Sequence, residues 1–154
     1  MRSRTSAALM IAAIICLCAS FAAAQIKPNF SGAWKMNPAK SKFEDGGPSG
    51  ITAKIDQKDD SVTEAITVTG DNGDQSVEGK YTTDGKEIEV QVGPNTAKGT
   101  AKWDGDALVI EWKSEGFIFR RKLALSTDGK TLTMAVHRTG ENGEVDETVV
   151  FDKQ

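Results

Sequence analysis

The sequence predicts an all-β protein: an up-and-down antiparallel meander of about ten short strands closed into a barrel. From residue 51 onward, apolar and polar residues alternate with the period of two that is typical of strands. Asp-Gly and Asn-Gly turns interrupt this pattern at intervals of about 8–12 residues, which indicates hairpins. No helical period is sustained after residue 24, so parallel βαβ arrangements are excluded. Closing the meander removes its edge strands, and a β-sandwich is the alternative.

The first expected strand is FSGAWKM, residues 30–36. Pro38 ends it, because proline cannot donate to a strand ladder and restricts the residue before it. The segment that follows, residues 37–50, is a long linker rich in proline and glycine. Long loops in compact domains are commonly functional. We therefore expect the linker to hold one helical turn around residues 39–42 and to lie across one barrel mouth.

The remaining strands are each an alternating run bounded by turn residues. The run EIEVQV, for example, places Ile88 and Val90 on one face, and the turn DGD, residues 104–106, separates the strands on either side of it. Short connections of this kind favour pairing between strands that are neighbours in the chain. The expected strands are 51–58, 61–70, 75–81, 87–92, 96–103, 107–113, 117–126, 131–138 and 145–152.

Residues 1–24 have the order of a secretory signal peptide, with a basic start, an apolar run and a small-residue cleavage site. We expect cleavage before Gln25, which leaves residues 25–154 as a single barrel domain in a secreted or periplasmic protein. The apolar run of about 15 residues is too short for a comfortable membrane span.

Composition narrows the function of the mature chain. Both cysteines, Cys16 and Cys18, lie in the signal segment, so no disulfide or thiolate ligand is expected after cleavage. Removing Arg2 and Arg4 from the 19 basic residues leaves 17 against 22 acidic residues, a net charge of −5. An acidic chain without a basic run is not expected to bind nucleic acid or, after cleavage, a membrane. We expect a monomer.

The motif Gly32-Ala33-Trp34 in the first strand resembles the Gly-x-Trp signature of the calycins, which include the lipocalins, the fatty-acid-binding proteins and the avidins. The stretches FSGAWKM, RRKLALSTDGKTLTM and ETVVFDK are similar to the opening, a late hairpin and the last strand of the fatty-acid-binding branch. The sequence also resembles a group of small secreted bacterial proteins of unassigned function. The resemblance implies a lipocalin-like barrel of ten strands, with a ligand in its interior.

Arg121 is the most informative departure from alternation, because it shares the inward phase of Phe119 and Leu123. A buried charge must be paired or must contact water or ligand. The resemblance implies that Arg121 reaches a ligand carboxylate. Pairing with an inward Glu64, or a place at the barrel rim, is the alternative. In the resembling branch, further anionic contacts come from an Arg-x-Tyr pair, and Val149 and Phe151 occupy those positions here.

The expected interior suits either a ligand cavity or a filled core. Trp34 is expected to close one end of the barrel, and Arg121 to make a polar ligand contact. The small inward residues Ala97, Gly99 and Ala101 either admit a ligand or accommodate large neighbours. The residues expected at the ligand site are Arg121, Trp34, Trp112, Phe117, Phe119, Phe151 and Tyr81.

No catalytic constellation is visible, so we expect a protein that is not an enzyme and that uses no cofactor and no metal. His137 is the only histidine and falls in the outward phase. The sequence therefore predicts a small-molecule binding protein for a hydrophobic or lipid-like ligand. The alternatives are a filled barrel that acts as a protein-interaction module, such as a protease inhibitor working through residues 25–29 or 39–50, and an enzyme of a rare barrel type.

Overall fold

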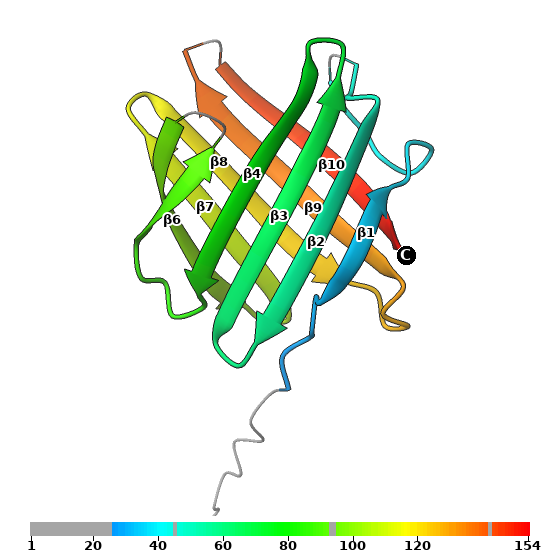
Figure 1. The fold of residues 1–154 in the computed structure, drawn as a ribbon, viewed down its shortest axis with the longest axis vertical. Helices are drawn as coiled ribbons and strands as arrows, with labels where there is room; N and C mark the ends of the chain where they lie inside the picture. The colour runs from blue at the N-terminus through cyan, green and yellow to red at the C-terminus, as the bar shows by residue number, and fades with distance from the viewer. Residues whose placement is uncertain (1–25, 45, 93–94, 142) are drawn as a thin grey trace, which may run out of the picture.

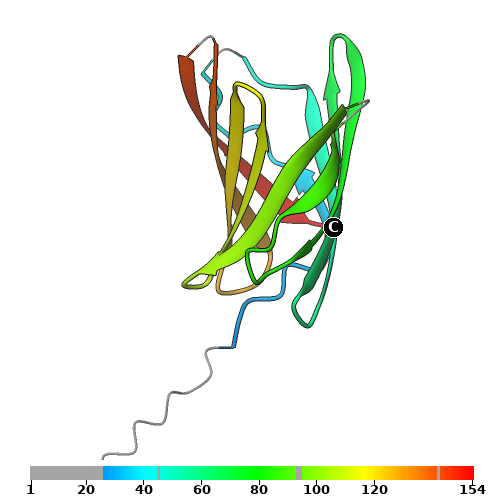
Figure 2. The ribbon, with the colours of Figure 1, turned by 90° about the vertical axis from the view of Figure 1, so that its left-hand side faces the viewer.

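A computed structural model describes residues 26–44, 46–92, 95–141 and 143–154, and the predicted signal peptide, 1–24, lies outside these ranges. Within them, ten antiparallel strands close into a barrel in which neighbours in the chain pair and the first strand pairs with the last (Figure 1 and Figure 2). This arrangement confirms the predicted meander and excludes the β-sandwich. The strands are β1 (Gly32–Met36), β2 (Gly50–Lys58), β3 (Ser61–Gly70), β4 (Gly73–Thr82), β5 (Ile88–Val92), β6 (Asn95–Asp104), β7 (Ala107–Ser114), β8 (Phe117–Leu125), β9 (Thr131–Gly140) and β10 (Gly143–Lys153).

The two ends of the barrel are formed by different turns of the chain. As drawn in Figure 1, the chain enters at the lower end, where the β2–β3 turn also lies. The turns that join β3 to β4, β7 to β8 and β9 to β10 lie at the upper end. Within the described ranges, no helix is long and apolar enough to cross a membrane.

The linker after β1 is fastened to β10. It begins with a turn at residues 38–40, in which the Ser41 backbone N–H donates to the Asn37 carbonyl over 3.1 Å. The expected helical turn around 39–42 corresponds to this single turn, which lies slightly earlier in the chain because Lys42 pairs with Thr148, whose carbonyl accepts from the Lys42 N–H over 2.7 Å. From this bridge the chain continues to the upper end of the barrel (Figure 2).

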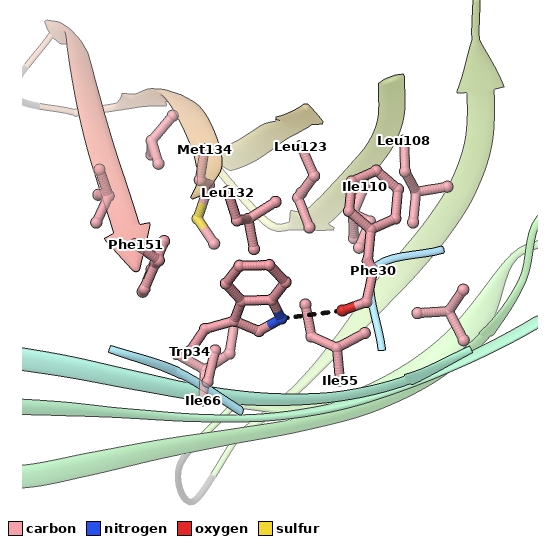
Figure 3. Close-up of a cluster of buried hydrophobic side chains, with 14 of the residues drawn as sticks. Phe30, Trp34, Ile55, Ile66, Leu108, Ile110, Leu123, Leu132, Met134 and Phe151 are labelled. Atoms are coloured by element: carbon pink, nitrogen blue, oxygen red, sulfur yellow. Dashed lines mark hydrogen bonds between the residues drawn. The ribbon is translucent and has the colours of Figure 1, made fainter. Parts of the chain in front are cut away.

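The lower half of the barrel is packed with apolar side chains around Trp34 (Figure 3). The buried indole donates its Nε1–H to the Phe30 carbonyl over 2.9 Å. Gly32 has a φ of 147°, and a Cβ there would lie 2.9 Å from Lys153 Cε. The Gly-x-Trp motif is thus explained by a conformation that favours glycine and by the side chain of β10 that crosses it. The other members of this packed half include Ile55, Leu108, Ile110, Leu123 and Leu132.

Two inward glycines make room for large side chains, one on its own strand and one mainly on neighbouring strands. A Cβ at Gly79 would lie 2.6 Å from the Tyr81 ring. A Cβ at Gly99 would overlap Val90 Cγ2 and lie 3.1 Å from Tyr81 Cε1 and 3.3 Å from Trp112 Cδ1. At Gly99, therefore, the small residue accommodates large neighbours and does not admit a ligand.

We expect Gly99→Ala to destabilise the fold by about 1–3 kcal/mol, the usual cost of adding a methyl group to a packed interior. Urea unfolding of the mature chain measures the change. Gly70→Ala is the matched control, because no heavy atom lies within 4 Å of a Cβ there and its φ is not positive. Equal unfolding free energies for the two variants would show that the interior around Gly99 is loosely packed.

Candidate functional site

The upper half of the barrel encloses a cavity of about 460 Å³. This volume lies within the range of about 300–1,000 Å³ that is typical of small-molecule sites. Most of the wall is apolar, and the polar side chains that border it are Gln75, Arg121, Arg138 and Glu147. The apolar lining consists of Phe43, Pro48, Ile51, Ile66, Val68, Val77, Trp112, Phe117, Phe119, Met134, Val136, Val149 and Phe151.

The cavity ends at a floor in the middle of the barrel. Trp112 of β7 and Arg121 of β8 border the cavity, whereas Ile110 and Leu123, the next inward residues below them, belong to the packed half. The same change occurs on β9 between Met134 and Leu132. The interior is therefore half filled and half hollow. We call the layer of Ile66, Trp112, Arg121, Met134 and Phe151 the floor.

Arg121 of the floor forms a buried ion pair with Glu64. Arg121 and Glu64 are each 1% exposed, and the guanidinium donates from Nη1 to Glu64 Oε2 over 3.1 Å and from Nη2 to Glu64 Oε1 over 2.5 Å. The charged plane of Arg121 stacks on Trp112, 4.4 Å from the ring centroid. Bidentate geometry and stacking are the conditions under which a buried pair offsets its desolvation.

Two further hydrogen bonds extend the pair into a network. The Tyr81 hydroxyl donates to Glu64 Oε1 over 3.1 Å, and it accepts from Trp112 Nε1 over 2.6 Å. The carboxylate of Glu64 thus accepts from both Arg121 and Tyr81, while the indole of Trp112 is fixed by Tyr81. The network sets the orientation of the aromatic ring that borders the cavity from below.

The Nε of Arg121 is buried and has no hydrogen-bond partner in the part of the chain that the structure describes. Burial opposes the charge of Arg121, but the Glu64 carboxylate outweighs it and raises the pKa of the guanidinium above its usual value. The group is therefore a permanent cation that is neutralised on one side and retains an unused N–H donor beside the cavity.

Burial also determines the protonation state of Tyr81. The apolar surroundings, and next the negative charge of Glu64, raise the pKa of the phenol above its usual value of 10.0. The hydroxyl is therefore neutral and remains a hydrogen-bond donor to Glu64 throughout the physiological range.

The mouth of the cavity lies at the upper end of the barrel. The Arg138 guanidinium donates from Nη2 to Glu147 Oε1 over 2.6 Å, and its Nε, like that of Arg121, has no partner among the described residues. Phe117 is 40% exposed at this rim, and the linker contributes Phe43 and Pro48. A second hollow, between the β7–β8 and β9–β10 hairpins, shares Phe117, Arg138 and Glu147 with the cavity. The expectation that the linker lies across one barrel mouth agrees with this geometry.

The structure separates the residues that the sequence placed at a ligand site. Arg121, Trp112, Phe117, Phe119 and Phe151 all border the cavity. Trp34 lies instead in the packed lower half, and Tyr81 reaches the cavity only through its bond from Trp112, so neither is among the described residues of the lining. Arg121 pairs with Glu64, which was the alternative to a free cation, and it also borders the cavity. Its contact with a ligand stays a prediction.

Two charged lining residues were not anticipated from the sequence, although the signal was present. Arg138 follows Met134 and Val136 in the inward phase of β9, and Glu147 precedes Val149 in the inward phase of β10. The alternation that identifies Arg121 identifies these charges as well. His137 lies on the outer face, 2.8 Å from Asp146, and no group of His, Cys, Asp and Glu in the described ranges is arranged to hold a metal ion.

Several solved protein structures are similar to this barrel in fold. Neither a family model nor a curated protein matches the sequence. Among solved structures, a REP1-NXSQ fatty acid transporter is 17% identical and aligns over 81% of this chain and 96% of its own, with a TM-score of 0.62. A secretory abundant heat soluble protein from Ramazzottius varieornatus is 15% identical over 83% and 98% of the two chains, with a TM-score of 0.64. Zebrafish ileal bile acid-binding protein with cholic acid is 20% identical over 81% and 98%, with a TM-score of 0.59.

These likenesses confirm the fold that the resemblance implied, a closed antiparallel barrel of ten strands that the fatty acid transporter and the bile acid-binding protein share. Two of the three neighbours are described as transport or binding proteins for lipids or bile acids. At such identities the comparison shows the architecture of the barrel, and the ligand site must be argued from the residues of this chain.

Tyr81 offers a direct test of the floor, because it is the only tyrosine in the sequence. Its pKa is higher in the folded than in the unfolded chain, so the unfolded chain loses the phenol proton first as the pH rises through about 10. The stability that the neutral phenol contributes is thus complete below that pH and is lost above it. We expect the ultraviolet absorbance of tyrosinate to appear only as the protein unfolds. Titration of the folded protein near the ordinary pKa of tyrosine would contradict the buried network.

Proposed function

We propose that this protein is an exported small-molecule binding protein that holds a hydrophobic or lipid-like ligand in the upper half of its barrel. The observation that carries the proposal is the cavity of about 460 Å³, with its apolar wall and the unpartnered Nε–H of Arg121 beside it. A mostly apolar cavity with a few convergent polar groups is the usual form of a small-molecule site.

The division of the barrel interior supports this function. The lower half is packed and holds the network of Glu64, Tyr81 and Trp112 in one arrangement. A ligand site built on such a rigid base loses little conformational freedom when it is occupied. The linker residues Phe43 and Pro48 complete the wall at the mouth, so a ligand would be enclosed along its length.

The export of the protein is a proposal from the sequence, since residues 1–24 have the order of a signal peptide. The structural neighbours support ligand binding in a general way, because a fatty acid transporter and a bile acid-binding protein share the fold. Together they favour a carrier or scavenger of apolar molecules outside the cytoplasm.

Native mass spectrometry of the protein from its exported fraction tests this function most directly. We expect a chain that begins at Gln25 and carries an extra mass that organic extraction removes. The extracted compound then identifies the ligand class. A bare chain that takes up no lipid from a panel of extracts would favour the alternative of a protein-interaction module.

A cavity-filling substitution tests the position of the site. Val68→Phe enlarges a half-buried lining residue of β3, and we expect it to weaken binding of the neutral dye Nile red about tenfold. Thr69→Phe is the matched control, because Thr69 is the next residue on the same strand and is exposed. Equal dye affinities for the two variants would place the binding site outside the cavity.

A further inference from the structure

The charges around the cavity are already paired. The two Nη groups of Arg121 both donate to Glu64, and Arg138 donates to Glu147. Each pair sums to zero net charge. Although two arginines border the cavity, its described lining therefore offers a ligand no uncompensated cation.

Each of the two arginines has one N–H group, at Nε, that lacks a hydrogen-bond partner among the described residues. The Nε atoms of Arg121 and Arg138 are both buried. Arg121 as a whole is 1% exposed and belongs to the floor, so a ligand oxygen reaches its buried Nε–H only when the side chains that cover this atom move aside. Arg138 stands at the mouth. An N–H donor without a partner is costly to bury, and an acceptor oxygen placed against it recovers that cost.

We propose that the cavity selects an uncharged amphiphile, whose acceptor oxygen binds the Nε–H of Arg121, over a ligand with a free carboxylate. This inference rests on the proposed function and specifies its ligand class. An ester, amide, ketone or alcohol oxygen at the floor accepts one N–H while its apolar chain runs along the wall toward the mouth. The Nε–H of Arg138 is a second donor for an oxygen at the other end of the ligand.

A carboxylate is disfavoured at the same place for two reasons. It would bring a second negative charge next to a guanidinium whose positive charge Glu64 already neutralises, so its own charge would be buried without compensation. It would also find a single N–H, where a carboxylate is best bound by two parallel donors of one guanidinium. Among the described residues, the other polar side chains that border the cavity are Gln75, Arg138 and Glu147, and Arg138 is itself paired with Glu147.

The first experiment compares three ligands of one chain length by displacement of Nile red from the wild-type protein at neutral pH. Methyl dodecanoate has a neutral carbonyl, dodecanoate has the same carbonyl with a charge, and dodecane has no acceptor. We expect methyl dodecanoate to bind about tenfold more tightly than either of the others. NMR of the arginine Nε–H groups should show the Arg121 resonance moving with methyl dodecanoate and not with dodecane.

A charge variant separates this preference from simple hydrophobicity. Glu64→Gln keeps the shape and an acceptor for Tyr81 but removes the charge that neutralises Arg121. We expect the ratio of ester to carboxylate affinity to fall at least about tenfold relative to the wild-type protein. Glu111→Gln is the matched control, because Glu111 pairs with Arg120 and Lys113 on the outer face of the barrel, and its ratio should not change.

The outcomes distinguish the inference from the function on which it rests. Tighter binding of dodecanoate than of methyl dodecanoate to the wild-type protein would overturn the inference and leave the proposed function standing. An unchanged ratio in a folded Glu64→Gln variant would do the same. If Nile red and all three ligands fail to bind, the proposed function falls and the inference with it. Should Glu64→Gln not fold, the wild-type affinities and the Arg121 resonance still decide.

Discussion

The buried ion pair between Arg121 and Glu64 is the interaction on which the interior of this barrel depends. Both side chains are almost completely removed from solvent, so either one alone would cost several kcal/mol. The pair is tolerated because the guanidinium is bidentate, stacks on Trp112 and shares its carboxylate with the Tyr81 hydroxyl. The bulk of these four side chains in turn requires the glycines on β4 and β6 that lie under the Tyr81 ring.

This network also lies between two halves of the barrel that are packed differently. Below it, apolar side chains around Trp34 fill the interior and supply the burial that stabilises a domain without disulfides. Above it, the strands continue with the same alternation, but their inward side chains leave a cavity between them. The network lies between the packed half and the cavity, and it therefore forms the boundary between them.

The sequence predicts the strands well, because alternation and Asp-Gly turns are local properties. It also identifies Arg121 as an inward charge, and the same alternation in the next strand places Arg138 inward. What alternation cannot give is the distance between side chains on opposite walls. Whether Gly99 opens space for a ligand or is filled by Tyr81 and Trp112 depends on strands far apart in the sequence. The path of the linker likewise depends on the bridge between Lys42 and Thr148, which no local pattern encodes.

Two independent features of this chain lead away from the carboxylate ligands that the resemblance to fatty-acid-binding proteins implies. The first is in the sequence, where Val149 and Phe151 stand at the positions of the polar pair in the last strand. The second is in the structure, where Glu64 occupies the side of Arg121 that a ligand carboxylate would otherwise bind. A barrel that lost only the polar pair would still attract anions through Arg121, and one that gained only Glu64 would still bind them at the last strand. With both features together, the interior combines a mostly apolar cavity with an arginine whose charge Glu64 already balances, and this combination is the basis of the proposed preference for uncharged ligands.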